Sequence, residues 1–403
     1  MIPVPAWDVE IGEMVECGQD FHKASRVLQR LQAEVKEESG SEDGGKICWG
    51  EVEKVCENRV SQVEVMSVDC WGDMVCTGDM SGGVGVTLGG RTLGLKPHHL
   101  CVSRTVFVGG EGALSVLSGS HDGTVRCTDL QAEKVCVEAR WDRREVRWLE
   151  VETTDNCLIN LGGREVVRLD RREGGQRNSL VKVEQPEQKV VENGKYLPTT
   201  WTSVRDHAKV GSNLSLCPTS PNLMSMVSGL SVLIYDLRSS VKPLHTLSHQ
   251  GGQNSRGWSG ASWSKDGKYL LGCQVSGMRA DQMECVVWEK DNLSEDSPVA
   301  SWPPSSNPHI GSSFSYYYGA SWSPWQEGVF LTTARLNSTL TKKVSSYYSV
   351  VAVDVTTNSV ISELSTDLSY NTFCIASHPT RPSLAVANTS MPGMLATYKY
   401  LST

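Results

Sequence analysis

The chain has 403 residues, and 38 lysines and arginines against 46 acidic residues give it a net charge of −8. This acidic balance argues against a protein that coats nucleic acid over its whole surface. A hydrophobic fraction of 39% suffices for a folded core and excludes global disorder. No apolar run approaches the roughly 20 residues that cross a bilayer. The first residues do not form a signal peptide either, so we expect no membrane partner.

Residues 1–45 are predicted to form a leader that differs from the rest of the chain. Within it, apolar residues recur at spacings of three and four from about residue 20 to residue 36, which predicts an amphipathic helix. The residues of this stripe are Phe21, Ala24, Leu28, Leu31 and Val35. An acidic, glycine-rich segment, 37–45, ends the helix. The helix either packs on its own domain or docks in a groove of a partner protein.

Residues 46–403 contain no convincing long helix. Short β-branched runs alternate with turns rich in Gly, Asn, Asp and Ser, which predicts an all-β fold. The plainest segment, Ser115 to Leu130, has two strands joined at Asp122-Gly123, where glycine can take the positive φ of a two-residue hairpin turn. Its second strand ends in a pattern typical of a WD repeat.

Six further segments are similar to this second strand. They are 83–89, 166–172, 232–238, 285–290, 349–355 and 394–400. We align the equivalent final positions at Asp129, Asp170, Asp236, Trp288, Asp354 and Tyr398. Seven units of about 40 residues, with polar inserts, predict a single seven-bladed WD40-type β-propeller over residues 46–403. The strand around residues 47–55 is expected to complete the last blade and close the ring.

The sequence offers no catalytic constellation. It contains no Gly-x-Ser-x-Gly elbow, no phosphate-binding loop and no His-Glu-x-x-His motif. The 13 cysteines include no Cys-x-x-Cys pair, and the nine histidines are dispersed along the chain. We therefore expect a protein that is not an enzyme and that uses no cofactor, no metal and no small-molecule substrate.

Two Asp-x-Arg sequences end successive predicted blades, at Asp170 and Arg172 and at Asp236 and Arg238. An arginine two residues beyond the aspartate projects from the end of its strand at the rim of the propeller. Its planar guanidinium can bind a carboxylate or carbonyl of a partner protein with two hydrogen bonds. The alternative is that each arginine pairs with the aspartate of its own blade.

A local basic patch, RWDRREVRW from Arg140 to Trp148, stands against the acidic background. Arginine and tryptophan bind phosphates and stack on exposed bases, so the loops on this opposite rim are candidate DNA contacts. The candidate residues are Lys96, His98, Arg140, Arg143, Arg144, Arg147, Arg164, Arg205, Lys209, Arg256 and Trp258. The alternative is a solvated rim on which arginine packs against tryptophan.

Several segments resemble one family, and they occur in the order expected for it. They are WGDMVCTGDMSGGVGV (71–86), KPH (96–98), SGSHDGTVRCTDL (118–130), LDRR (169–172), IYDLR (234–238), GASWSPWQEGVF (319–330) and SHPTRPSLAVANTS (377–390). Together they are similar to the WD-repeat family of the changed-mutation-rate protein, WD-repeat protein seventy-six and the small subunit of the damaged-DNA-binding complex. The resemblance covers roughly residues 60–403.

The resemblance implies a DNA-binding protein of the DNA damage response that docks as a substrate receptor on the adaptor propeller of a cullin-4 ubiquitin ligase. It implies a nuclear location, possible also in the cytoplasm, although no nuclear signal is visible. The Asp-x-Arg sequences match the family's adaptor-docking box, with Tyr235 in place of the usual tryptophan, and the helix with Phe21 and Leu28 would be a second adaptor contact.

The chain departs from the family at basic positions. Met80 and Leu100 stand where the family has lysine and arginine, and Tyr316, Tyr317 and Tyr318 lie near a replaced Arg-Trp pair. These departures weaken the case for DNA more than the case for the fold. A WD-repeat scaffold that binds other proteins without contacting nucleic acid is therefore the alternative function.

Overall fold

The structure is a computed structural model, and it describes most of the chain after residue 46. The described ranges are 47–88, 91–110, 113–130, 134–142, 144–163, 165–172, 176–182, 191–192, 195–196, 213–228, 231–239, 242–248, 257–276, 282–302, 310–312, 320–337, 346–365, 372–379, 381–388 and 393–402. The leader helix predicted around residues 20–36, with Phe21 and Leu28, lies outside these residues and stays a prediction. Among the described residues, no helix is long and apolar enough to cross a membrane.

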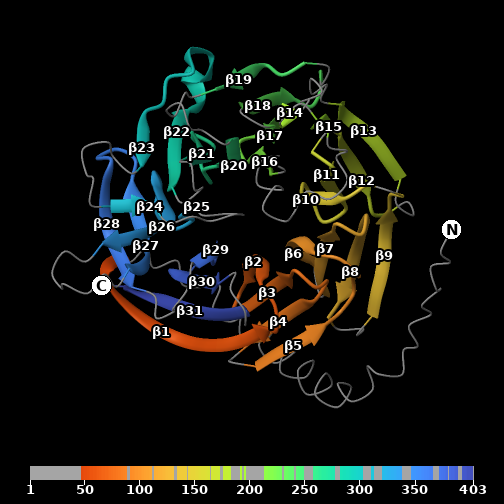
Figure 1. Cartoon of the computed structure of the whole chain (residues 1–403), viewed down its shortest axis with the longest axis horizontal. Helices are drawn as coiled ribbons and strands as arrows, with labels where there is room; N and C mark the ends of the chain where they lie inside the picture. Colours follow the sequence, from red (N-terminus) through yellow and green to blue (C-terminus); the bar gives the residue numbers. More distant parts are fainter. Residues whose placement is uncertain are drawn as a thin grey trace.

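Seven antiparallel sheets stand around a common centre as the blades of a propeller (Figure 1). Blade 1 contains β2 (Val65–Trp71), β3 (Met74–Asp79), β4 (Val84–Leu88) and β5 (Arg91–Leu95). Blade 2 contains β6 (Val102–Gly110), β7 (Ala113–Ser120), β8 (Thr124–Asp129) and β9 (Lys134–Arg140). Blade 3 contains β10 (Val146–Val151), β11 (Asn156–Leu161), β12 (Glu165–Asp170) and β13 (Gln176–Lys182).

The remaining blades follow the same plan. Blade 4 contains β16 (Leu214–Cys217), β17 (Ser220–Ser228), β18 (Ser231–Asp236) and β19 (His245–Leu247). Blade 5 contains β20 (Gly257–Trp263), β21 (Tyr269–Ser276), β22 (Gln282–Glu289), the 3-10 helix η2 (Lys290–Glu295) and β23 (Ala300–Trp302). In blade 6, β24 (Ile310–Ser312) and β25 (Ala320–Trp322) both pair with β26 (Val329–Asn337), followed by β27 (Ser346–Asp354) and β28 (Ser359–Ser365). A small hairpin, β14 (Val191–Glu192) and β15 (Lys195–Tyr196), lies between blades 3 and 4 in the chain.

Blade 7 joins the two ends of the described chain. Its inner three strands are β29 (Thr372–Ser377), β30 (Ser383–Asn388) and β31 (Gly393–Ser402). Its outer strand is β1 (Ile47–Ser61), which pairs antiparallel with β31 from Ile47 opposite Ser402 to Ser61 opposite Gly393. The predicted closure of the ring by the first strand is therefore confirmed.

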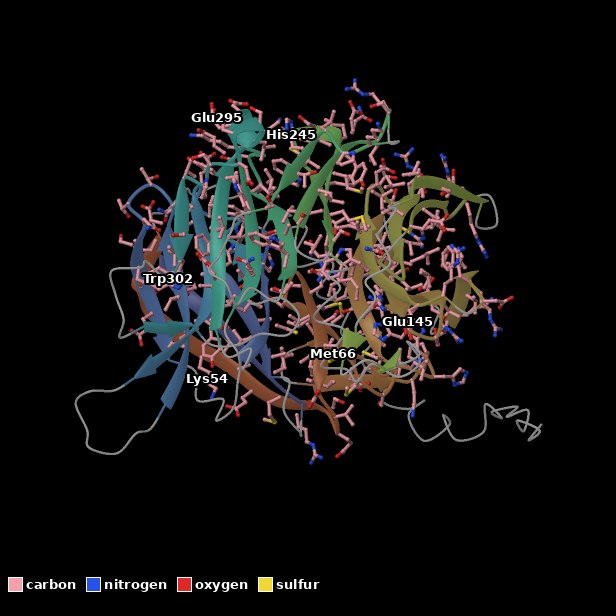
Figure 2. The ribbon with its side chains drawn as sticks, turned by 45° about the horizontal axis from the view of Figure 1, so that its top comes forward. Lys54, Met66, Glu145, His245, Glu295 and Trp302 are labelled. Carbon is pink, nitrogen blue, oxygen red and sulfur yellow. The ribbon has the colours of Figure 1, made fainter. Side chains whose placement is uncertain are left out.

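The antiparallel order of each blade defines two rims. The turns between second and third strands and the loops that lead into the next blade lie on one rim, which we call the upper rim. The turns between first and second strands and between third and fourth strands lie on the other, which we call the lower rim. Figure 2 shows Met66 and Glu145 at the upper-rim ends of two inner strands. Glu295 in η2, at the top of this view, lies on the lower rim of blade 5.

The seven strands aligned from the sequence are the third strands of their blades, but their register needs a correction. In six blades the residue after the final position donates its backbone N–H to a carbonyl at the start of the second strand or just before it. The bonds run from Leu130, Arg171, Leu237, Lys290, Val355 and Tyr400 to Leu114, Asp155, Asn222, Lys268, Gly328 and Pro382. The final positions of blades 5 and 7 are thus Glu289 and Lys399, one residue after the predicted Trp288 and Tyr398.

Three residues, His121, Asp122 and Gly123, connect β7 to β8, instead of the predicted two-residue turn at Asp122-Gly123. The N–H of Gly123 donates to the carbonyl of Ser120 at 3.0 Å, so His121 and Asp122 form the centre of the turn. Gly123 has a φ of +79°, and a Cβ atom there would lie 2.4 Å from the carbonyl oxygen of Trp141. Glycine is needed both for the positive φ and for this close approach of the next blade's loop.

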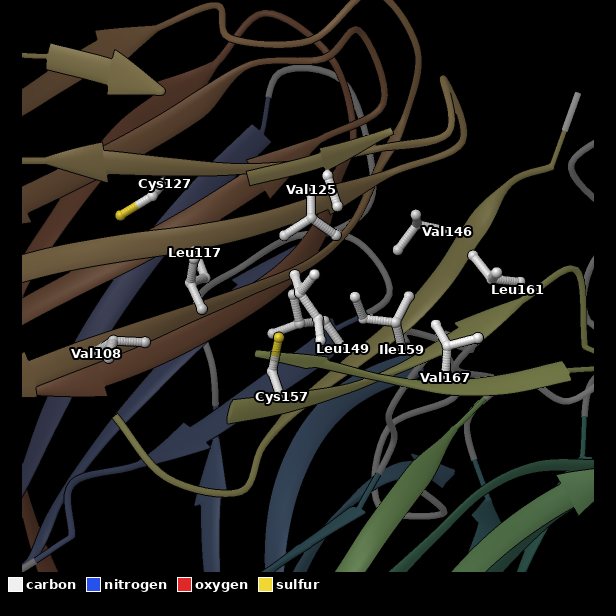
Figure 3. Packing of buried hydrophobic residues seen from close by; sticks show 12 residues of the cluster. Val108, Leu117, Val125, Cys127, Val146, Leu149, Cys157, Ile159, Leu161 and Val167 are labelled. Atoms are coloured by element: carbon white, nitrogen blue, oxygen red, sulfur yellow. The ribbon is translucent and has the colours of Figure 1, made fainter. Parts of the chain in front are cut away.

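Neighbouring blades pack face to face through apolar side chains. Figure 3 shows the cluster between blades 2 and 3, where Leu117 and Val125 of one blade meet Leu149 and Ile159 of the other. Val125, Leu149 and Ile159 have no exposed surface. Because each sheet is covered on both faces in this way, the ring of blades is itself the hydrophobic core.

Truncation of Ile159 to alanine is predicted to lower the free energy of unfolding by about 3 kcal/mol, because it leaves a cavity between two blades. Val137→Ala, on the outer strand β9 with 55% of the residue exposed, serves as the matched control and is expected to cost less than about 0.5 kcal/mol. Urea denaturation followed by tryptophan fluorescence measures both values. Equal effects of the two substitutions would contradict the packing described here.

Candidate functional site

The arginines of the two Asp-x-Arg sequences fold back onto the aspartates of their own blades. Asp236 accepts hydrogen bonds from the backbone N–H of Arg238 at 2.9 Å and from its guanidinium Nε at 3.0 Å and Nη2 at 2.6 Å. Asp170 likewise accepts from the N–H of Arg172 at 3.0 Å and from its Nη2 at 3.0 Å. The two arginine side chains are nevertheless 72% and 61% exposed. Arg172 also places Nη1 3.8 Å from Oδ2 of Asp155. Each guanidinium is therefore fixed in direction, and both side chains remain largely exposed.

The aspartate forms the turn that presents the arginine. The Asp236 carboxylate accepts a hydrogen bond from the backbone N–H of Arg238, two residues later. The Asp354 carboxylate accepts the equivalent bond from the N–H of Thr356 at 2.7 Å, so the same turn occurs where the third residue is not arginine. Hydrogen bonds from Arg238 lower the pKa of Asp236 to about 2, and those from Arg172 lower the pKa of Asp170. Both pairs thus stay ionised at neutral pH. Since they are surface pairs, they contribute little to stability.

The two pairs lie on the lower rim of adjacent blades. Blades 3 and 4 pack directly on each other through a cluster that includes Trp148 and Leu158 on one side and Met226 and Tyr235 on the other. Within the described residues, the Nη1 group of Arg238 makes no hydrogen bond. This rim therefore offers a partner two oriented guanidinium groups from neighbouring blades.

The described part of the basic patch on the upper rim is largely neutralised by its own surroundings. Arg144 pairs with Glu165, Arg147 pairs with Glu145 at 3.1 Å, and Arg140 lies 3.8 Å from Asp142. The guanidinium of Arg177 lies 4.7 Å from the ring centre of Trp141 and donates to the carbonyl of Arg140 at 2.7 Å. Four arginines thus stand against three carboxylates. The geometry matches the alternative of arginine–tryptophan packing, with Arg140, 73% exposed, open to solvent.

Two predicted DNA contacts are buried, which corrects their placement on the surface. His98 is 1% exposed, and its ring nitrogens lie 2.8 Å from Ser118 Oγ, 3.0 Å from Thr124 Oγ1 and 3.3 Å from Asp122 Oδ2. Burial lowers the pKa of His98, although Asp122 opposes this effect. Trp258 is completely buried, with its ring 5.3 Å from that of Trp288. Both side chains hold their blades together and cannot reach a ligand.

The other predicted residues divide into two groups. Lys96 is exposed in the upper-rim loop between blades 1 and 2. The remaining candidates lie outside the described residues and stay predictions: Arg143, Arg164, Arg205, Lys209 and Arg256.

The sequence analysis missed a set of polar side chains on the innermost strands. Asp69 accepts the N–H of Phe107 at 2.9 Å, and Glu150 accepts the N–H of Leu216, each across to the next blade. Arg104 lies between them, with its guanidinium 4.6 Å from the ring centre of Trp148. Burial raises the pKa of Glu150 to about 7, and Arg104 only partly opposes this. A carboxylate at the fifth position of a short apolar strand is the signal that could have identified both residues.

The comparisons with known proteins give the fold. No protein-family profile matches the chain, and no curated protein matches it. The β-propeller domain of Cps50 (Swd1) from Myceliophteria thermophila superposes with a TM-score of 0.60 at 14% identity, over 87% of this chain and 100% of that one. The fold is a WD40 β-propeller. At this identity the likeness concerns the fold alone, and a fold does not by itself determine function.

No group of three or more His, Cys, Asp or Glu side chains in the described part of this WD40 propeller is arranged to hold a metal ion. The buried thiols are also poorly suited to chemistry, since burial raises the pKa of Cys76 well above its usual range and that of Cys157 to about 12. What the propeller offers is surface: two rims with oriented charged side chains.

The raised pKa of Glu150 predicts a pH dependence of stability. Between the ordinary pKa of a glutamate and about 7, the folded state binds the proton more tightly than the unfolded state, so stability falls as pH rises through this window. Glu150→Gln removes this loss and is expected to be more stable than the natural chain at pH 8 by about 1–2 kcal/mol, with the difference vanishing near pH 4.5. Denaturant titrations across this range measure it. Glu53→Gln, on the exposed face of β1, is the control, and a flat difference for Glu150→Gln would contradict the burial of its carboxylate.

Proposed function

We propose that this WD40 propeller is a non-enzymatic interaction protein that docks by its lower rim onto the adaptor propeller of a cullin-4 ubiquitin ligase. The observation that carries the proposal is the pair of exposed guanidinium groups, Arg172 and Arg238, each oriented by its own aspartate on adjacent blades. The resemblance of both sequences to the family's adaptor-docking box supplies the identity of the partner. Tyr235, buried beneath Asp236, stands at the tryptophan position of that box.

The path of the chain supports the same rim. β1 begins at Ile47, opposite Ser402 of the third strand β31, which runs toward the lower rim. Residues 1–46 are thus attached near the lower rim of blade 7. The predicted second adaptor contact, the leader helix with Phe21 and Leu28, would be tethered on the side where the Asp-x-Arg arginines lie.

Substitution of both arginines tests this docking. Arg172→Ala combined with Arg238→Ala is expected to weaken binding to the purified adaptor at least about tenfold, because hydrogen bonds from a charged group contribute roughly 1.5–3 kcal/mol each. Biolayer interferometry with immobilised adaptor measures the dissociation constant. Arg140→Ala, an exposed arginine on the upper rim, is the matched control and should leave the affinity unchanged. Undiminished binding of the double variant would refute the assignment.

DNA recognition by the upper rim is the second candidate function, and it would accord with the nuclear location that the resemblance implies. It is favoured by Arg140 and Lys96, which are exposed on this rim. The local pairing of the other arginines with Glu145 and Glu165 limits the number of phosphates that this rim can neutralise. We therefore propose a weak, strongly salt-dependent contact, with preference for damaged duplexes.

Fluorescence anisotropy with undamaged and ultraviolet-damaged duplexes at several salt concentrations tests this second function. The affinity is expected to fall as salt rises, and removing Arg140 and Lys96 together should reduce the logarithmic salt slope by about 2. Arg238→Ala on the opposite rim is the control and should not change the slope. The absence of binding to either duplex at low salt would leave the scaffold function alone.

A further inference from the structure

A cavity of about 350 Å³ opens on the lower rim between blades 5 and 6. Its walls are residues 264–266, in the loop between β20 and β21, and the segment 322–328, which ends β25 and leads into β26. We call it the Trp325 pocket. Blades 5 and 6 lie beyond blade 4 in the ring (Figure 1), so the pocket is separate from the Asp-x-Arg arginines of blades 3 and 4.

Two tryptophans that line the pocket are fixed by hydrogen bonds to neighbouring blades. The indole Nε1 of Trp322 donates to the carbonyl of Ser262 at 2.8 Å, and that of Trp325 donates to the carbonyl of His378 at 2.6 Å. Trp322 also stacks on Tyr269, with ring centres 6.1 Å apart. Trp322 is only 8% exposed and also packs on Phe330, whereas Trp325 is partly exposed. Because the indole N–H of Trp325 is already used within the protein, this side chain offers π surface rather than a hydrogen-bond donor.

The charged residues of the pocket have an acidic balance. Oδ1 of Asp266 accepts from Ser264 Oγ and from the N–H of Lys268, which fixes the direction of this carboxylate. In the described part of the chain, neither Asp266 Oδ2 nor the exposed carboxylate of Glu327 has a hydrogen bond or ion pair. The opposing ammonium, Lys265, reaches the carbonyl of Pro324 at 3.5 Å. Two carboxylates against one ammonium leave the pocket with a net charge of −1.

We propose that the Trp325 pocket binds an arginine side chain presented by a partner protein. The volume suits one long side chain, and the negative balance excludes an anionic one. A planar guanidinium can stack on an indole face while its N–H groups bind the carboxylates of Glu327 and Asp266. A lysine fits less well, because its ammonium is a strongly hydrated point charge without a planar face. This inference does not depend on the docking of the Asp-x-Arg arginines.

The full chain labelled with 5-fluorotryptophan provides the test, with Trp325→Phe to assign the resonance. Three capped peptides are titrated at constant ionic strength: Ac-Gly-Arg-Gly-NH₂, Ac-Gly-Lys-Gly-NH₂ and Ac-Gly-Glu-Gly-NH₂. The arginine peptide is expected to shift the ¹⁹F signal of Trp325 saturably, the lysine peptide to bind at least about threefold more weakly, and the glutamate peptide not to bind. Equal shifts with arginine and glutamate, equal affinity for arginine and lysine, or no shift at all would overturn the proposal.

Substitutions identify the groups that hold the guanidinium. Glu327→Gln and Asp266→Asn are each expected to weaken binding of the arginine peptide at least about threefold. Glu295→Gln, which removes an exposed carboxylate elsewhere on the lower rim of blade 5, is the matched control and should have no effect. Since Glu327 is exposed, its substitution tests the pocket even if Asp266→Asn disturbs its turn. Undiminished affinity in Glu327→Gln would overturn the assigned role of this carboxylate.

Discussion

Each blade of this propeller ends at the centre of the ring in a strand whose inner edge has no further strand to pair with. Unpaired N–H groups buried at such an edge would cost free energy. Side chains on the inner strand of the preceding blade accept them: Ser67 Oγ accepts the N–H of Thr105 at 2.7 Å, and Asn213 Oδ1 accepts the N–H of Ala261 at 3.0 Å. The ring thus depends on polar residues at positions where a sandwich sheet would place valine or leucine.

This constraint explains why acidic groups lie deep in the molecule. Asp69 and Glu150 serve the same purpose as Ser67, and burial raises the pKa of both. Arg104, stacked on Trp148, supplies the nearby positive charge. The charged centre accordingly caps strand edges, with Asp69, Arg104 and Glu150 each partly exposed.

How the charges are paired distinguishes the rims. On the lower rim an aspartate orients each arginine of the Asp-x-Arg sequences from within the same turn, so its guanidinium stays exposed. On the upper rim Arg144 pairs with Glu165 and Arg147 pairs with Glu145, two residues before it, which neutralises much of the patch where DNA would lie. The sequence shows the number of arginines in RWDRREVRW, but the neutralising Glu165 is contributed by a different hairpin.

Local patterns were predictable from the sequence, and contacts between blades were not. The seven third strands could be aligned because in each one inward-facing and outward-facing residues alternate over a short run that ends in a turn. The register was wrong in blades 5 and 7 because Glu289 and Lys399 replace the aspartate that marks the end of the strand. His98 and Trp258 were placed on the surface because a loop position in the sequence does not show that Ser118 or Trp288 covers the side chain. The partners that inner-strand side chains find on the next blade have no local signal, although a carboxylate within a short apolar strand, as at Asp69 and Glu150, marks such a position.

The closure of blade 7 also determines when the molecule can be completed. β1 is synthesised before the other described strands and its partner β31 after them, and 332 positions separate Ser61 from Gly393. Until β31 has been synthesised, the first strand has an open edge, so the other six blades form an unclosed arc. Closing so long a loop is slow compared with forming the hairpins inside each blade. The newly made chain therefore passes through a state with exposed strand edges in which association with other chains competes with closure of its own ring.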